Sequence, residues 1–306
     1  MNWYPLALPQ QAGRRYLVTG ANRGLGFFTA ARLAAAGAHV VLAGRSAERL
    51  DAARSAIRGA RPAASVEAIV LDTSSQASVL RATDALLQVE PFDGIVANAG
   101  MVHTPRTREL SVDGDELVLA TNVLGHFTLL ARLVPHLTLG ARVVLLGSLS
   151  SRLSTFRLSD LQLEHGYDSW RAYAQSKIAS QMLGFELDRR LRAAGVAVSS
   201  VVAHPGYSVS GRTPTVPGVN EPSRRDRFGD ALQSAWAQGK HRGAEVPLHA
   251  LTAPDVTGGQ FWGPEYLTRG APALQKPTRV SSDPALGARF WTFAEETTGR
   301  EFTVGA

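Results

Sequence analysis

The sequence of 306 residues contains no cysteine. This absence excludes disulfide bonds, zinc–thiolate sites and thiol catalysis, and it suits a reducing compartment. No run of about 18 apolar residues occurs, so we expect no transmembrane helix. The N-terminal residues also lack the charged segment and apolar core of a signal peptide. From these absences we expect a cytoplasmic protein with no membrane anchor.

The charge balance is basic, with a formal net charge of +6 and a sequence pI near 10.0. Nearly all of the positive charge is arginine, and the arginines are scattered singly instead of forming a basic stripe. A nucleic-acid-binding protein would gather them on one face. We therefore expect no nucleic-acid partner, and at most one phosphate site among these side chains.

Short apolar runs alternate with longer helical stretches through the first half of the chain. Strands that are apolar throughout belong to a sheet covered on both faces, and strand–helix repeats give parallel pairing with right-handed crossovers. The pattern predicts an α/β fold with a doubly wound parallel sheet. The expected strands are 16–18, 39–43, 66–71, 95–97 and 142–146, and the expected helices are 25–36, 48–58, 76–89 and 112–133.

The second half continues the same pattern after an interruption. The segment 208–227 is rich in Pro, Gly, Ser, Thr and charge, and predicts either a substrate lid or a loose surface connection. Because helix-then-strand patterning resumes after it, we expect a single domain over residues 1–306. The other expected elements are a helix at 169–194, a strand at 196–202, a helix at 246–253, a strand at 258–263 and a final helix at 284–302.

A glycine-rich stretch, Thr19 to Gly26, connects the first strand to the first helix. Gly20, Gly24 and Gly26 would permit a tight turn and let the backbone approach a pyrophosphate at the helix N-terminus. An ordinary strand–helix turn is the alternative. The position of the glycine-rich stretch between the first strand and a helix favours nucleotide binding.

The end of the second strand carries Gly44 and Arg45, where an acidic residue would hold the ribose 2′-hydroxyl of NAD. A guanidinium suits a 2′-phosphate instead. Arg23, inside the glycine-rich stretch, could approach the same phosphate. The alternative for Arg45 is a solvated loop arginine.

Three further strand ends should face the same edge of the sheet. Asp72-Thr73 could hold an adenine ring, although Asp72 also suits a helix N-terminal cap. Asn98-Ala99-Gly100 follows the next strand. Ser148 could hydrogen-bond a reacting oxygen or merely start a turn.

Tyr173 and Lys177 stand four residues apart on one expected helix, so their side chains share a face. A neighbouring cation favours the phenolate and would lower the pKa of Tyr173 toward the working range. Two interface residues of an amphipathic helix are the alternative. Asn122, a polar residue in an apolar stretch, is either a surface position or an inward-facing anchor.

Taken together, these motifs resemble the short-chain dehydrogenase/reductase family over nearly the whole chain. The gap of 25 residues between Ser148 and Tyr173, together with the sequence around Tyr167 and Trp170, looks like the retinol-dehydrogenase-like branch. The resemblance rests on Thr19-Gly20-x-x-x-Gly24-x-Gly26, Asn98-Ala-Gly100, Asn122, Ser148, Tyr173-x-x-x-Lys177 and Pro205-Gly206.

The resemblance implies a Rossmann-type domain that binds NADP(H), or less readily NAD(H), and no metal. Tyr173 would be the general acid/base, Ser148 would orient the substrate oxygen, Lys177 would lower the Tyr173 pKa and bind the ribose, and Asn122 would order a water. Ser210 stands where the family usually has threonine. The implied cofactor contacts are Gly20, Asn22, Arg23, Gly24, Leu25, Gly26, Arg45, Asp72, Thr73, Asn98, Ala99, Gly100, Tyr173, Lys177, Pro205, Gly206 and Ser210.

The function expected is an NADP(H)-dependent oxidoreductase that interconverts an alcohol and a carbonyl on a lipophilic small molecule. A non-catalytic NADP-binding redox sensor or scaffold is the alternative, but it would not need Tyr173 or Ser148. A homodimer is compatible with the family. The sequence identifies neither the substrate nor the direction of the reaction.

Overall fold

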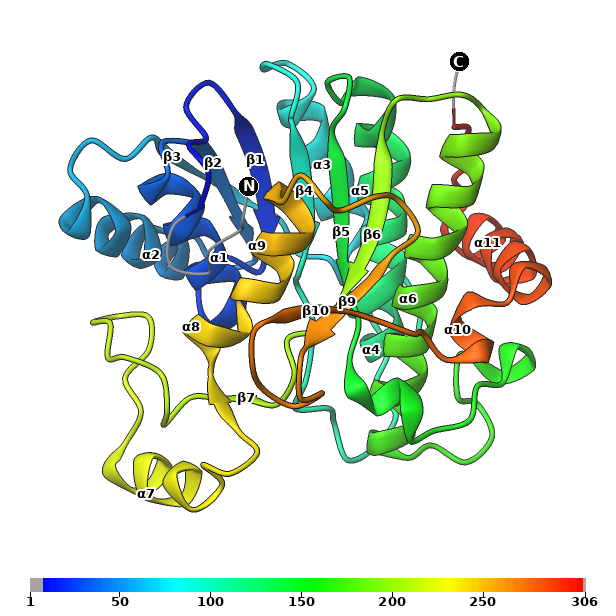
Figure 1. The fold of residues 1–306 in the computed structure, drawn as a ribbon. Coiled ribbons are helices and arrows are strands. Elements are labelled where there is room, and N and C mark those ends of the chain that lie inside the picture. Colours follow the sequence, from blue (N-terminus) through cyan, green and yellow to red (C-terminus); the bar gives the residue numbers. More distant parts are fainter. Residues whose placement is uncertain (1–7, 305–306) are drawn as a thin grey trace.

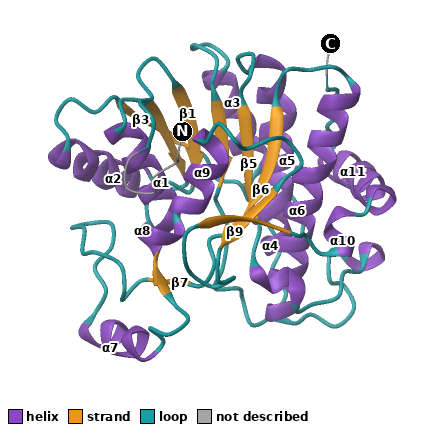
Figure 2. Cartoon of the chain, in the orientation of Figure 1, coloured by secondary structure: helices purple, strands orange, loops and turns teal. Residues whose placement is uncertain are grey.

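The apolar runs form the centre of one eight-stranded sheet in the computed structural model, which describes residues 8–304. Figures 1 and 2 show the sheet between two layers of helices. All neighbouring strands pair in parallel except the edge pair β9–β10. In spatial order the strands are β3 (Val66–Val70), β2 (His39–Gly44), β1 (Arg15–Thr19), β4 (Gly94–Ala97), β5 (Arg142–Leu146), β6 (Ser199–Ala203), β9 (Phe261–Pro264) and β10 (Pro272–Gln275).

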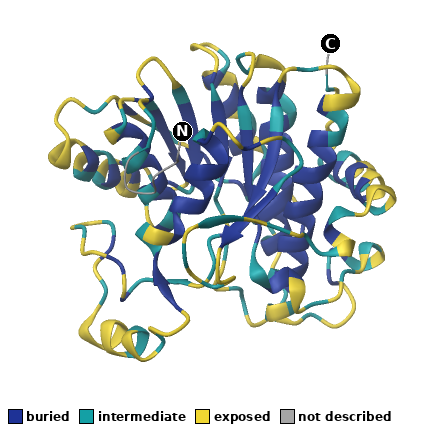
Figure 3. Cartoon of the chain, viewed as in Figure 1, coloured by how far each residue is buried: buried dark blue, intermediate teal, exposed yellow. Residues whose placement is uncertain are grey.

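Alternate residues of each central strand belong to two separate cores. In β1, Leu17 faces one core, whereas Tyr16 and Val18 face the other. One core is covered by α1 (Gly24–Ala35), α2 (Ala47–Ala60) and α9 (Glu245–Thr252). The other is covered by α3 (Gln76–Leu86), α5 (Gly125–Leu133) and α6 (Ser169–Ala193), with α11 (Pro284–Thr298) packed outside α6. Figure 3 shows that the sheet and the inner helix faces are buried. The doubly wound architecture predicted from the sequence is confirmed.

The helix expected at 112–133 begins later and is interrupted. The chain from Leu110 to Glu116 is a bridged loop with a turn at Gly114 (φ +91°), and the buried Glu116 carboxylate accepts the backbone N–H groups of Val118 and Leu119. The helix then runs as α4 (Leu117–Leu119), a π-helical turn η1 (Ala120–Leu124) and α5. The expected N-terminal boundary was therefore wrong, because Glu116 caps the helix.

One stretch in residues 8–304, Leu117–His136, is long and apolar enough to cross a membrane by length and composition alone. In the fold, 78% of its most apolar window is buried. It packs against the sheet, α3 and α6. Its apolar character is thus accounted for by its place in the core.

The C-terminal half differs from expectation at its edges. Strand β10 was not expected, and β9 starts three residues later than expected, because its pairing with β6 begins at Phe261. Gly258 lies in the preceding turn, where its backbone approaches the buried Asp188 carboxylate too closely for any side chain. The final helix stops at Thr298, followed by Gly299 in the left-handed region. Short helices α8 (Lys240–Gly243) and α10 (Arg279–Ser282) complete this half, with 3-10 turns η2 (Val134–His136), η3 (Leu149–Arg152) and η4 (Leu158–Asp160) elsewhere in the chain.

The segment expected as a lid is an excursion with its own structure. Two short strands, β7 (Ser208–Val209) and β8 (Gln238–Gly239), pair in parallel and bring its ends together. Between them lies the flap, defined here as residues 210–237, which carries the exposed helix α7 (Arg224–Leu232). Figure 1 shows it projecting away from the sheet below α1 and α2. Part of the flap nevertheless reaches α2, since a Cβ at Gly218 would lie 3.4 Å from Cβ of Ala52.

Candidate active site

The predicted site residues meet at the C-terminal edge of the sheet. β1 leads into the glycine-rich turn, β4 into Asn98-Ala99-Gly100, β5 into Ser148, and β6 into Pro205-Gly206. Parallel strands that end at one edge bring such side chains and backbone groups together. Helix α6 crosses the same end and adds Tyr173 and Lys177.

The glycine-rich turn is built around close backbone contacts. Gly20 has φ +65°, and a Cβ on it would lie 2.8 Å from Cα of Ala99. A Cβ on Gly26 would lie 2.5 Å from the Asn98 amide nitrogen. Helix α1 begins at Gly24 with no side-chain cap from Arg23 and no acidic residue in its first turn. Its free N–H groups therefore form a positively polarised cradle that fits a dinucleotide pyrophosphate.

A buried hydrogen-bond chain ties this turn to the helix that carries Asn122. The hydroxyl of Thr19 accepts the backbone N–H groups of Asn98 and Ala99, each at 2.9 Å. His126 Nδ1 lies 3.1 Å from the Asn122 carbonyl, which can only accept, so Nδ1 carries the proton and Nε2 accepts from Thr19 at 2.9 Å. Asn98 Nδ2 donates to the Thr19 carbonyl at 2.8 Å. In this structure the Asn98 side chain holds the glycine-rich turn.

Asn122 is an inward-facing anchor, with 2% of its surface exposed. Its Oδ1 accepts the backbone N–H of Met101 at 2.7 Å, and its Nδ2 donates to the Ser176 hydroxyl at 2.8 Å. The π-helical turn places it there, and its carbonyl accepts from His126 and from the Ser180 hydroxyl. The surface alternative for Asn122 is therefore wrong.

Tyr173 and Ser148 face one another although 25 residues separate them in sequence. The Tyr173 hydroxyl lies 3.3 Å from Ser148 Oγ. Ser148 also caps the turn η3, accepting the Ser150 N–H at 3.2 Å, so the turn-starting alternative is true as well. Gln181 Nε2 donates to the Ser148 carbonyl at 3.2 Å and to the Ser151 hydroxyl at 2.9 Å. These bonds fix the serine turn against α6.

The ammonium of Lys177 is buried beneath the same corner. It donates to the Leu146 carbonyl at 3.0 Å, and a Cβ on Gly100 would lie 3.5 Å from Nζ and 3.2 Å from Asn122 Oδ1. Burial lowers the pKa of Lys177 to about 8. Burial also raises the pKa of Tyr173, and the Ser148 hydrogen bond only opposes this. The expectation that Lys177 lowers the tyrosine pKa is thus wrong for this arrangement, because desolvation of the phenol prevails.

The residues expected to contact the adenosine part of the dinucleotide are less tightly held than those around Tyr173. Arg23 and Arg45 are exposed, and the backbone of Gly44 approaches Asn22, so that a Cβ there would lie 3.2 Å from Asn22 Oδ1. The Asp72 carboxylate accepts the N–H and hydroxyl of Ser74. Helix α3 is capped by Ser75, so the capping alternative for Asp72 is wrong.

Two positions at the end of β6 lie where the flap begins. Gly206 has φ +67° and approaches the Thr268 carbonyl closely, which fixes the turn after Pro205. The Ser210 hydroxyl accepts from the ammonium of Lys240 at 2.7 Å. Thr73 is buried, and Leu25 lies in the first turn of α1.

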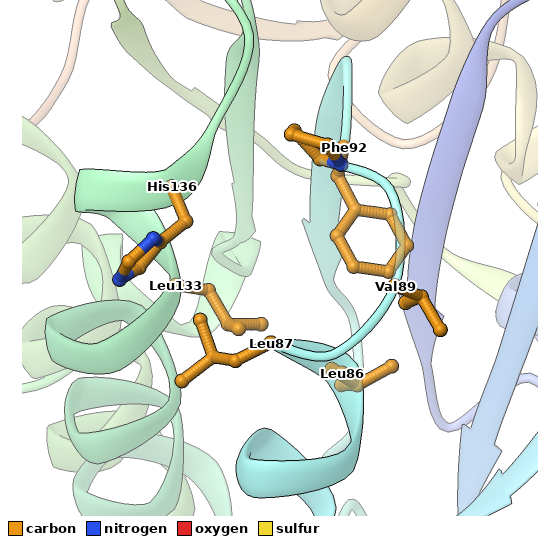
Figure 4. Close-up of a pocket in the computed structure, with 7 residues that line it drawn as sticks. Leu86, Leu87, Val89, Phe92, Leu133 and His136 are labelled. Atoms are coloured by element: carbon orange, nitrogen blue, oxygen red, sulfur yellow. The ribbon is translucent and has the colours of Figure 1, made fainter.

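Two cavities lie away from this corner. One of about 70 Å³ lies between the end of α3, the residues just before β4 and the end of α5, and is lined by apolar side chains and His136 (Figure 4). The other, of about 520 Å³, lies between the C-terminal part of α6 and residues 301–304. Because the strand C-termini carry the candidate groups, neither cavity contributes to the site.

Sequence reasoning missed His126 and Lys240. His126 follows Asn122 by one helical turn, and that spacing could have indicated it. Lys240 had a compositional signal, because only three of the 32 basic residues are lysine and one of them is Lys177.

The model of the family described as short chain dehydrogenase matches residues 14–215. Mouse polyprenol dehydrogenase is 34% identical over 96% of this chain and 87% of its own length. Mouse retinol dehydrogenase 14 is 33% identical over 82% of this chain and 78% of its own length. These relatives place the chain near the retinol-dehydrogenase-like branch.

Solved structures agree with the fold. The crystal structure of an uncharacterized protein from Mycobacterium Paratuberculosis is 34% identical, with a TM-score of 0.80 and 99% of each chain covered. A Pseudomonas aeruginosa RhlG/NADP active-site complex is 27% identical, with a TM-score of 0.61 over 86% of this chain and 97% of that chain. With the site geometry, these findings show that the chain belongs to the short-chain dehydrogenase/reductase family, oxidoreductases that act on CH–OH groups with NAD(P) as acceptor.

Proposed function

We propose that this protein is an NADP(H)-dependent oxidoreductase that interconverts an alcohol and a carbonyl on a lipophilic small molecule, with Tyr173 as general acid/base. The observation that carries the proposal is the pair of hydroxyls of Tyr173 and Ser148, 3.3 Å apart at the end of β5. Two adjacent hydroxyls can both reach one substrate oxygen, which a protein that only binds nucleotide does not require.

A bound dinucleotide supplies the hydride carrier. Ser148 would hold the substrate oxygen, and the Tyr173 hydroxyl would exchange a proton with it. Because burial raises the pKa of Tyr173, the phenol is protonated at neutral pH, which suits donation to a carbonyl oxygen.

Lys177 and Asn122 would support the same exchange. With a pKa lowered to about 8, Lys177 is mostly protonated at neutral pH and can interact with ribose hydroxyls. The Asn122 side chain is committed to Met101 and Ser176, which supports a positioning role for it. The water-ordering role implied by the family stays a prediction.

Preference for NADP(H) is supported by the end of β2. Gly44 brings no carboxylate, and a side chain there would crowd Asn22 and Leu50. Arg45 is exposed beside it, with a planar guanidinium suited to bidentate contact with a 2′-phosphate. Arg23 is exposed in the glycine-rich turn and would approach the same phosphate.

A lipophilic substrate is supported by the surroundings of Tyr173. The ring of Trp170 lies 6.3 Å from that of Tyr173 and is 49% exposed. Leu153, after the Ser148 turn, is also exposed. Polyprenol and retinol dehydrogenases among the relatives act, by their names, on apolar alcohols. The cytoplasmic location, the absence of a nucleic-acid partner and a homodimer stay predictions.

The test is oxidation of NADPH or NADH by the purified protein against a panel of ketones, aldehydes, steroids and quinones. We expect NADPH to be consumed, and fastest with lipophilic carbonyl compounds. Tight NADPH binding without turnover on any member would favour the sensor or scaffold alternative. Equal rates with small polar and lipophilic carbonyls would contradict the substrate class.

A further inference from the structure

Lys240 lies over the N-terminus of α1, although the chain between them spans most of the protein. A Cβ on Gly24, the first residue of α1, would lie 3.6 Å from Lys240 Cδ and 3.8 Å from Nζ. The ammonium therefore lies directly beside the turn that fits a pyrophosphate. Lys240 is the first residue of α8 and follows β8, which closes the flap.

The same side chain is bonded to the start of the flap. Its Nζ donates to the Ser210 hydroxyl at 2.7 Å, and its backbone N–H donates to Thr213 Oγ1 at 2.8 Å. Lys240 thus links the flap to the glycine-rich turn through one side chain and one backbone group. Ser210, the hydrogen-bond partner of the ammonium, is neutral, and the carboxylate that acts on the ammonium is Asp230 in the flap.

Three positive features converge at this point. They are the N-terminal pole of α1, the ammonium of Lys240 beside Gly24, and the charge of Arg23, the N-cap residue, which is near enough to repel that ammonium. Burial lowers the pKa of Lys240, and repulsion from Arg23 lowers it further, with Asp230 opposing. Cations at a helix N-terminus are unfavourable unless an anion lies between them. The arrangement is suited to a bound dianionic group.

We propose that Lys240 contacts the diphosphate of the bound dinucleotide and thereby couples cofactor binding to the position of the flap. The inference rests on the proposed function for the presence of a dinucleotide at this turn. On binding, the ammonium would bridge the diphosphate and Ser210. The flap would then be held over the site by the charge of the cofactor itself.

The test compares wild type with Lys240→Met in direct binding, by calorimetry, to three ligands. ADP-ribose and NADPH contain the diphosphate, whereas 2′-AMP lacks it. A charge-assisted hydrogen bond lost from the diphosphate should weaken ADP-ribose and NADPH binding roughly 10- to 100-fold. Binding of 2′-AMP should stay within about twofold, because that ligand has no group for Lys240 to meet.

Two control variants isolate the charge and its place. Lys240→Arg keeps the cation and should restore most of the affinity. Arg242→Met removes the same charge from the same short helix, but its guanidinium pairs with Glu245 at 3.1 Å and should leave all three affinities unchanged. Thermal unfolding of each variant checks that it is folded. Equal weakening by Arg242→Met would overturn the assignment in favour of a general field effect.

Limited trypsin digestion gives a second readout. Arg224, Arg225 and Arg227 in α7 are exposed cleavage sites. Saturating ADP-ribose should protect them in wild type and protect them much less in Lys240→Met. Wild-type affinity and wild-type protection in Lys240→Met would overturn the inference. A wild type that binds ADP-ribose in this way but reduces no carbonyl would instead overturn only the proposed function.

Discussion

Two regions at the same edge of the sheet are held in different ways. Around Tyr173, the buried side chains of Asn122, Lys177 and His126 are fixed by hydrogen bonds to neighbouring elements. At the adenosine end, Arg45 is exposed, and within residues 8–304 no hydrogen bond or ion pair fixes its guanidinium. On the proposed function, the fold would position the groups that carry the chemistry, whereas contacts with the ligand would set the choice of cofactor.

The flap belongs with the second region. Helix α7 carries Phe228 at 70% exposure and Leu232 at 69%. Within the flap, Arg227 bonds to the Gly211 carbonyl and the Thr215 hydroxyl, and Asp230 accepts the Gly211 N–H. The flap is thus organised internally: α7 has no buried residue, whereas Val216 and Val219 pack against the core that α1 and α2 cover. An exposed helix such as α7 moves at low free-energy cost, which suits a lid.

The largest effect should come from removing one hydroxyl in the fixed region. Tyr173→Phe should lower kcat about 10²- to 10⁴-fold while NADPH binding stays nearly unchanged, because the ring keeps its packing and only the proton carrier is lost. Steady-state kinetics and a binding titration measure both. Tyr167→Phe is a matched control, since its hydroxyl bonds to the Pro105 carbonyl. Activity of Tyr173→Phe within about threefold of wild type would refute its role.

A pH titration of stability tests whether burial fixes the same region. Burial lowers the pKa of His126 to about 4, against 6.5 when unfolded. Between these values the unfolded chain takes up a proton that the folded protein does not, so stability falls as the pH falls from 6.5 to 4. The loss should approach about 3 kcal/mol for this residue, and His204, also lowered to about 4, adds to it.

The measurement is the free energy of unfolding by urea at several pH values. His126→Gln should have a visibly shallower pH dependence than wild type. His165→Gln, at a side chain 88% exposed, should keep the wild-type slope. The same slope in all three proteins would mean that His126 titrates normally and is not enclosed in the corner.

Cofactor choice gives the next effect in size. Arg45→Ala should weaken NADP binding roughly 10- to 100-fold and change NAD binding little, because only NADP offers a 2′-phosphate to the guanidinium. Dissociation constants of both cofactors measure this, with Arg49→Ala on the exposed side of α2 as a control for charge. A wild type that binds both cofactors equally, or a variant that loses both equally, would refute the assignment.

The sequence predicted the buried surroundings of Tyr173 better than the exposed cofactor-binding residues and the flap, for physical reasons. Tyr173-x-x-x-Lys177 follows from helical periodicity, and strand order places Ser148 beside it. The 25-residue gap could not show that the two hydroxyls meet. The raised pKa of Tyr173 was also invisible, because burial and not the neighbouring lysine decides it. The sequence did not predict Lys240 as a site residue, because its proximity to Gly24 depends on the path of the whole flap.

The central claim is that the fold alone holds the groups around Tyr173 in place, whereas the parts that select the cofactor become ordered only through contacts with it. Hydrogen exchange tests this claim most directly. The exchange of backbone amides in α6 near Tyr173 is compared with that in the flap and in residues 208–227, the lid predicted from the sequence. Each is measured with and without NADPH and a substrate analogue. The α6 amides should exchange slowly in both conditions, and the flap amides should slow roughly tenfold or more only with ligands. Fast exchange in α6 without ligand, or equal flap exchange in both conditions, would contradict the account.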